Sequence, residues 1–181
     1  SATNENLSAN KGGEAVHSPF PSGINGLKLW LDASDSSTLF ADTNFNTPAT
    51  SIVASWMDKS GNNNHLLGQG DPRTTARNHN GQNVIDFDGN DYFKSSSAYA
   101  TGNDFSFLMV AGIDAISSLY NSILAIRQSI GHPSFQIDAG ESSQFRLRFY
   151  DQDMGTAKTF ASSSQHGPSI YEFIFNGTAD L

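Results

Sequence analysis

Apolar and polar residues alternate along several stretches of the chain, with the period of two that places every second side chain on one face of a β-strand. In residues 144–150, for example, Phe145, Leu147 and Phe149 share one face, and polar residues occupy the other. Similar runs predict further strands at residues 27–31, 51–56, 65–67, 83–88, 91–93, 122–126, 134–138 and 169–175. Helical periodicity nowhere exceeds a turn or two. The pattern therefore predicts an all-β chain of short antiparallel strands.

Two segments refine this prediction. Residues 105–113 are almost continuously apolar, which is typical of a central strand that is buried on both faces. Gly89 and Asn90 separate two runs that carry aromatic residues, and such a pair favours a tight turn. We therefore expect residues 83–88 and 91–93 to pair as a hairpin.

The beginning of the chain differs in composition from the rest. Residues 1–23 are polar and glycine-rich and end in a segment with two prolines, so they have little apolar surface to bury. We expect them to form a flexible arm or linker, and residues 24–181 to form a single β-sandwich domain. The first residues lack the basic and apolar regions of a signal peptide, so we expect an N-terminus produced by processing or excision.

Composition and charge exclude several classes of function. Ten Lys and Arg residues against eighteen Asp and Glu residues give a formal net charge of −8, which disfavours nucleic acid and anionic lipid as partners. The longest apolar run is far shorter than the roughly 20 residues of a membrane-spanning helix, so membrane insertion is not expected. The chain has no cysteine for disulfides, thiolate metal sites or nucleophilic catalysis. Only 15% of its residues are charged, which is typical of secreted and cell-surface β-domains.

Three motifs follow one another in an order that resembles a known family. They are GLKLWLDASD at residues 26–35, VASWMDKSGNNNH at residues 53–65 and NVIDFDGNDYF at residues 83–93. Together they resemble the concanavalin A-like lectin/glucanase superfamily, in its laminin-G-like jelly-roll branch. The resemblance implies a two-sheet antiparallel jelly-roll sandwich, found as an extracellular module of adhesins or beside polysaccharide-degrading enzymes.

The resemblance also bears on the C-terminal end of the domain. Related domains continue after the segment that matches residues 171–177 with closing strands, whereas this sequence stops at Leu181. We therefore expect a sandwich that lacks its closing C-terminal strands, because the chain is a fragment or because another chain supplies a strand. In the second case, an open sheet edge would contact that other chain.

The loop at residues 58–65, DKSGNNNH, consists mostly of residues that favour turns. In the domains that it resembles, this loop is mainly a structural corner packed beside the leading strand, and we favour that interpretation here. The alternative is a loop that binds calcium or contacts a sugar, since calcium takes carboxylate and amide oxygens. The candidate metal ligands are Asp32, Asp35, Asp58, Asn62, Asn64 and Asp88.

The residues of a glycosidase are missing. Glucanases of the superfamily carry an E-x-D-x-x-E motif, which supplies the two carboxyl groups of a retaining mechanism. None of the four glutamates of this chain lies in such a motif, so we expect no enzymatic activity. Asp86, Asp88 and Asp91 form the densest carboxylate cluster. Asp86 and Asp88 could point to the same side of a strand as an acid/base pair, but a tight turn at residues 88–91 explains the cluster better.

The remaining interpretation is a lectin-like domain. Aromatic side chains stack on sugar rings, and guanidinium groups donate hydrogen bonds to hydroxyl or acidic groups. The candidate ligand-binding residues are Tyr92, Tyr99, Tyr120, Arg146, Arg148 and Tyr150. We therefore predict a non-catalytic, glycan-binding domain of a secreted or surface protein, with a polysaccharide or other glycan as its partner and calcium as its candidate cofactor. The alternative is a structural or assembly module of a surface layer, a filament or a viral particle.

Overall fold

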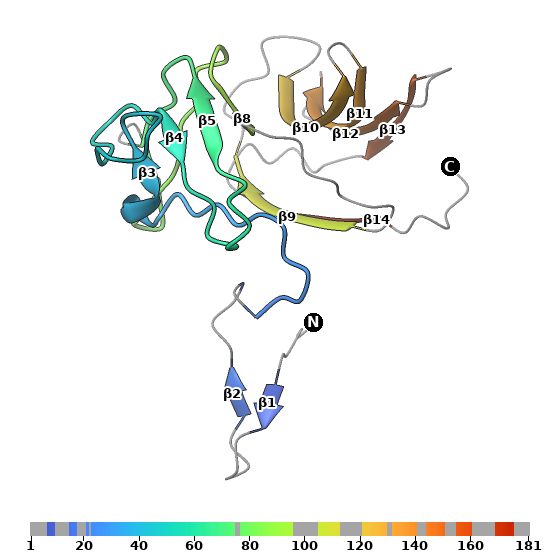
Figure 1. Cartoon of the computed structure of the whole chain (residues 1–181). Coiled ribbons are helices and arrows are strands. Elements are labelled where there is room, and N and C mark those ends of the chain that lie inside the picture. Colours follow the sequence, from blue (N-terminus) through green and yellow to red (C-terminus); the bar gives the residue numbers. More distant parts are fainter. Residues whose placement is uncertain are drawn as a thin grey trace. The chain divides into compact units, whose positions relative to one another are not determined.

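The chain is all-β in the computed structural model, and its strands pair in antiparallel sheets (Figure 1). The structure describes residues 7–9, 15–17, 21, 23–74, 77–95, 105–112, 121–129, 132–140, 144–150, 155–160 and 169–175. The helical element in these ranges is a short 3-10 turn, η1 (Ser36–Thr38). The chain divides into two compact units, Ser1–Gly102 and Asn103–Leu181, each of which is described by itself below.

The first unit contains a four-stranded sheet in the order β3-β4-β5-β8 (Figure 1). Its strands are short: β3 (Leu39–Phe40), β4 (Ser55–Trp56), β5 (Leu66–Gln69) and β8 (Tyr92–Ser95). The predicted return of the chain at residues 65–67 is confirmed, because β5 pairs antiparallel with β4. Gly68 of β5 lies against the backbone of Val53 and Ala54, which precede β4. A Cβ atom at this position would come within 2.5 Å of the Val53 carbonyl oxygen, so the site requires glycine.

Two small hairpins also belong to this unit. β1 (Leu7–Ala9) pairs with β2 (Ala15–His17) within the segment that composition predicts to be an arm. β6 (Asn78–His79) pairs with β7 (Gln82–Asn83). Asn80 and Gly81 join β6 to β7 with φ values of 50° and 77°, the left-handed angles that an Asn-Gly hairpin turn requires.

The core of the first unit is small. Leu39 and Val53 are completely buried, and the Trp56 ring packs edge-on against Phe93 with their centroids 5.5 Å apart. Phe40 packs in the same manner against Phe45. Since few large apolar side chains are buried among the described residues of this unit, hydrogen bonds in the loops contribute a large share of its specificity.

The second unit contains two antiparallel sheets. One pairs β9 (Phe105–Ala111) with β14 (Ser169–Phe175). The other is a meander of β10 (Asn121–Ser129), β11 (His132–Gly140), β12 (Gln144–Tyr150) and β13 (Gly155–Phe160). The strands predicted at residues 144–150 and 169–175 are confirmed with their bounds. Among the described residues, no helix has the length and apolar character needed to cross a membrane.

The predicted hairpin of residues 83–88 with 91–93 is wrong. β8 pairs with β5, and Asn83 pairs with Asn78 of the neighbouring hairpin. The Asp91 carboxylate explains the difference, because it accepts hydrogen bonds from the backbone N–H groups of Asp71, at 2.7 Å, and Asp88, at 3.1 Å. These bonds fix the turn beside the end of β5, so the chain continues along β5 instead of folding back.

Two other predicted strands differ from the structure. Residues 27–31 have no ladder partner among the described residues, because side chains of a loop bind their backbone instead. Residues 105–113 were predicted to form a central strand that is buried on both faces. In the described part of the chain β9 has one ladder neighbour, β14, and the side chains of Leu108 and Val110 on one of its faces are 51% and 65% exposed.

Candidate functional site

The loop that follows Trp56 is organised around the carboxylate of Asp58, which is 5% exposed. Its Oδ1 atom accepts hydrogen bonds from the backbone N–H groups of Trp30, at 2.9 Å, and Ser60, at 2.8 Å. Its Oδ2 atom accepts from the Ser60 hydroxyl, at 2.7 Å, and from the Asn64 N–H, at 3.0 Å. Burial alone would raise the pKa of Asp58, but these hydrogen bonds outweigh it and lower the pKa.

The asparagines of the loop bind the segment that precedes β3. The side-chain amide of Asn62 donates to the Leu27 carbonyl oxygen, and that of Asn64 donates to the Lys28 carbonyl oxygen, both at 2.8 Å. Asn63, between them, has a φ of 60°, which asparagine tolerates better than most residues. The prediction that this loop is a corner packed beside residues 27–31 is confirmed.

A small charged cluster lies next to the corner. The Lys59 Nζ atom is 3.0 Å from an Asp32 carboxylate oxygen and 2.7 Å from one of Asp35, and it lies 4.4 Å from the centroid of the Trp30 ring. The Asp35 hydrogen bond is the largest effect on Lys59 and raises its pKa. Burial would raise the pKa of Asp32, but hydrogen bonds from Ser34 and Lys59 lower it, and the hydrogen bond from Lys59 is the main cause that lowers the pKa of Asp35.

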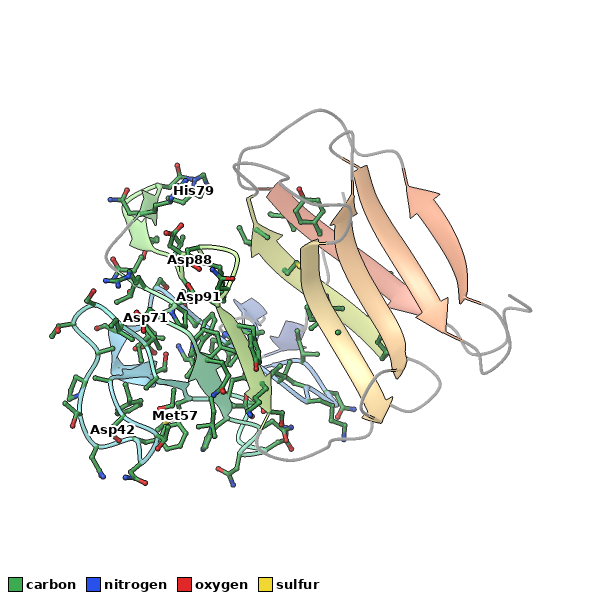
Figure 2. The ribbon with its side chains drawn as sticks, turned by 90° about the horizontal axis from the view of Figure 1, so that it is seen from above. Asp42, Met57, Asp71, His79, Asp88 and Asp91 are labelled. Carbon is green, nitrogen blue, oxygen red and sulfur yellow. The ribbon has the colours of Figure 1, made fainter. Side chains whose placement is uncertain are left out.

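The predicted metal ligands fall into two places. Five of them lie in or beside the corner: Asp32, Asp35, Asp58, Asn62 and Asn64. The carboxylates among them already accept hydrogen bonds from other groups of the protein or form ion pairs with Lys59. Asp88 lies in the turn that also contains Asp91, near Asp71 (Figure 2), and its Oδ1 atom accepts the Asn90 N–H at 2.9 Å. In the part of the chain that the structure describes, no three His, Cys, Asp or Glu side chains form a group that could hold a metal ion. Calcium binding stays a prediction.

The acidic cluster at residues 86–91 has the contacts of a turn. Asp88 and Asp91 accept hydrogen bonds from backbone N–H groups, and the Asp86 carboxylate lies 3.0 Å from Arg77 Nε. Carboxylates that accept hydrogen bonds from nearby backbone N–H groups are expected in a tight turn, which is the interpretation that the sequence favours for this cluster.

The predicted sugar-binding residues are distributed over both units. Tyr92 lies on β8 and is 53% exposed. Arg146, Arg148 and Tyr150 occupy alternate positions of β12. Arg146 lies opposite Asp138 of β11 and Thr159 of β13. Tyr99 and Tyr120 lie outside the described residues.

A pocket of about 320 Å³ lies in the first unit, and the sequence did not predict it. Its lining includes Leu39, Ala49, Thr74, Arg77, Asn78 and Asn83. Asn78 and Asn83 are cross-strand partners in the β6–β7 hairpin, the hairpin that carries His79 in Figure 2, so their side chains leave the hairpin on the same side. The one sequence signal nearby is the Asn-Gly turn between β6 and β7.

Thr74 is the most buried polar group of the pocket, with 7% of its surface exposed. Its N–H donates to the Ser51 carbonyl oxygen at 2.9 Å, but its buried hydroxyl has no hydrogen-bond partner among the described residues. Buried hydroxyl groups are nearly always satisfied. The pocket therefore lies beside a buried hydroxyl without a partner, and the side chains of two asparagines line it.

Comparison of the chain with protein-family models, with curated proteins and with solved structures finds no match.

Proposed function

We propose that this protein is a non-catalytic, glycan-binding domain, and that it binds its glycan in the pocket beside the β6–β7 hairpin. The observation that carries the proposal is the lining of the pocket, which combines three hydroxyl-bearing residues, two amides and a guanidinium with the apolar side chains of Leu39 and Ala49. A sugar residue offers the complementary groups, since its hydroxyls both donate and accept and its C–H faces are apolar. The pocket volume of about 320 Å³ lies at the lower end of the range of small-ligand sites.

The same lining supports binding without hydrolysis. A retaining or inverting glycosidase needs two carboxyl groups on either side of the scissile bond. Among the described residues that line the pocket, none is an Asp or a Glu. The nearby Asp86 carboxylate is engaged with Arg77 at 3.0 Å.

The proposal extends to the architecture and the location. The three motifs that resemble the laminin-G-like branch support a concanavalin A-like jelly roll, and the antiparallel sheets of both units are compatible with it. The low content of charged residues supports a secreted or surface-displayed domain. An experimental structure tests the architecture: two sheets packed face to face would support it, and two independently folded domains would contradict it.

The binding test uses a glycan array, followed by titration calorimetry with the best ligand, in calcium and then in EDTA. Asn83→Ala removes one amide from the pocket, so binding should weaken at least tenfold. Gln82→Ala is the matched control, because Gln82 is exposed in the same strand and is not among the residues that line the pocket. Equal affinities of the two variants would contradict the assignment of the pocket. Loss of binding in EDTA would support the calcium site predicted at the corner.

Assembly is the second candidate function, and a specific face of the second unit favours it. The side chains of Leu108, Val110, Ile170 and Ile174 are 51–72% exposed. Val110 pairs directly with Ile170 across β9 and β14, so these residues share one sheet face. A second copy of the chain would present the same apolar surface, and packing the two copies would remove both from water.

Sedimentation velocity over a range of concentrations tests this alternative. If the face mediates assembly, the wild-type protein should self-associate and Val110→Gln should shift it towards the monomer. Gln82→Ala should not, because Gln82 is exposed on β7 in the first unit and does not belong to this face. A wild-type protein that is monomeric at every concentration would contradict the assembly role.

A further inference from the structure

We infer that the pocket selects uncharged saccharides, which it holds by adjacent hydroxyl groups, with the Thr74 hydroxyl as the buried contact. This inference rests on the proposed glycan-binding function and adds the chemical class of the ligand. It rests on the charge of the pocket, the spacing of its two amides and the buried hydroxyl.

The charges around the pocket disfavour an acidic sugar. Arg77 is the cation of the lining, and its Nε atom lies 3.0 Å from Asp86 Oδ1. An anionic sugar would therefore approach a guanidinium whose charge a carboxylate already balances. The charge of the chain as a whole adds to this effect, because its formal net charge is −8. An uncharged ligand is not repelled by this negative charge.

The two amides suit a pair of neighbouring hydroxyls. Asn78 and Asn83 lie directly opposite each other in the β6–β7 pair, so their Cβ atoms are about 4.5–5.5 Å apart. Each amide carries an NH₂ donor and a carbonyl acceptor. A hydroxyl group also donates and accepts, so two hydroxyls on adjacent ring carbons can each bind one amide. This pairing distinguishes a saccharide from a ligand with a single polar group.

Thr74 supplies the contact that is deepest in the protein. Its hydroxyl is buried and has no partner among the described residues, whereas its backbone N–H is satisfied by Ser51. The hydroxyl is not accessible in this rotamer, so contact with a ligand requires a rotation about χ1 that turns it towards the pocket; a ligand hydroxyl then gives Thr74 the missing hydrogen bond. A site of this kind discriminates strongly against ligands that lack the matching hydroxyl, because the buried group then stays unsatisfied. Leu39 and Ala49 provide apolar surface for the C–H groups of the ring.

The test compares three sets of oligosaccharides on the wild-type protein: hexose-only, uronic acid-containing and sulfated. Hexose-only ligands should bind at least tenfold more tightly than either acidic set. Thr74→Val keeps the shape of the side chain but removes the hydroxyl, and it should weaken binding about tenfold or more. Thr74→Ser should restore most of the affinity. The fluorescence of Trp30 and Trp56, both in this unit, verifies that each variant is folded.

A charge variant makes the prediction sharper. Asp86→Asn removes the negative charge beside Arg77, so the difference in affinity between hexose-only and acidic ligands should narrow. Tighter binding of acidic ligands by the wild-type protein, or unchanged binding by Thr74→Val, would overturn the inference and leave the proposed function standing. A folded wild-type protein that binds none of the three sets, nor any glycan on the array, would overturn both.

Discussion

Replacing Asp58 by Asn tests whether one carboxylate holds the corner together. The change keeps the size of the side chain but leaves a single oxygen to accept hydrogen bonds. If that oxygen takes the position of Oδ1, it keeps the bonds from Trp30 and Ser60, and the Asn64 N–H then faces an NH₂ group. An unsatisfied buried N–H costs about 1–3 kcal/mol, and the two remaining bonds lose the strength that the charge gave them, about 0.5–1 kcal/mol each.

These contributions predict that Asp58→Asn lowers the free energy of unfolding by about 3 kcal/mol. This is a large fraction of the roughly 5–15 kcal/mol that stabilises a typical domain. Tryptophan fluorescence recorded during urea unfolding measures this loss of stability, because both tryptophans of the chain lie in the first unit and the backbone N–H of Trp30 donates to Asp58. The midpoint should fall without a change in slope.

Asp42→Asn is the matched control. Asp42 also accepts hydrogen bonds from three backbone N–H groups, those of Asn44, Asn46 and Thr47, but it does so in an exposed loop where water can replace it. Its substitution should therefore cost clearly less. If the two variants lose the same stability, or if Asp58→Asn loses less than about 0.5 kcal/mol, the corner does not depend on the carboxylate.

Three further predictions concern the same unit. The pKa of Asp58 is lowered from 3.8, so the stabilisation that its carboxylate provides is complete above that pH and is lost as the pH falls through the folded pKa. The difference in urea midpoint between the wild type and Asp58→Asn should therefore be constant at about pH 5–7 and shrink below about pH 3.8. Lys59→Met breaks two partly exposed ion pairs and should cost only about 1 kcal/mol in the same assay, a loss that should be smaller in 1 M salt. Gly68→Ala places a methyl group against the Val53 carbonyl oxygen and should lower the free energy of unfolding by about 1–3 kcal/mol. If the variant has the same melting temperature as the wild type, the backbone at this position can accommodate a Cβ atom and the reasoning is wrong.

The sequence predicted those strands whose alternation was regular. The strand at residues 144–150 was found with its bounds, because each of its faces is uniform in character. β13 was missed, because its sequence, GTAKTF, has no regular alternation of apolar and polar residues. The hairpin at residues 83–93 failed for another reason: the Gly-Asn turn was present, but a carboxylate contact with Asp71 decided where the following strand goes.

The corner and the pocket differ in how far the sequence revealed them. The corner consists of one continuous loop, and its unusual content of Asn and Gly was enough to predict a shaped structure that packs against residues 27–31. The pocket is formed by three separate segments, with lining residues at positions 36–39, 49–50 and 74–83. In a chain rich in asparagine, neither Asn78 nor Asn83 stands out before the pairing of β6 with β7 is known.

The corner also determines which substitutions homologues can accumulate. The loop recognises residues 27–30 through their carbonyl and N–H groups, which every amino acid except proline provides in full. Side chains in that segment can therefore change without loss of these contacts, whereas Asp58, Asn62 and Asn64 cannot. Evolutionary constraint should be concentrated in the loop, and an inserted residue in either segment should be far more damaging than a substitution, because it would displace every backbone group from the side chain that binds it.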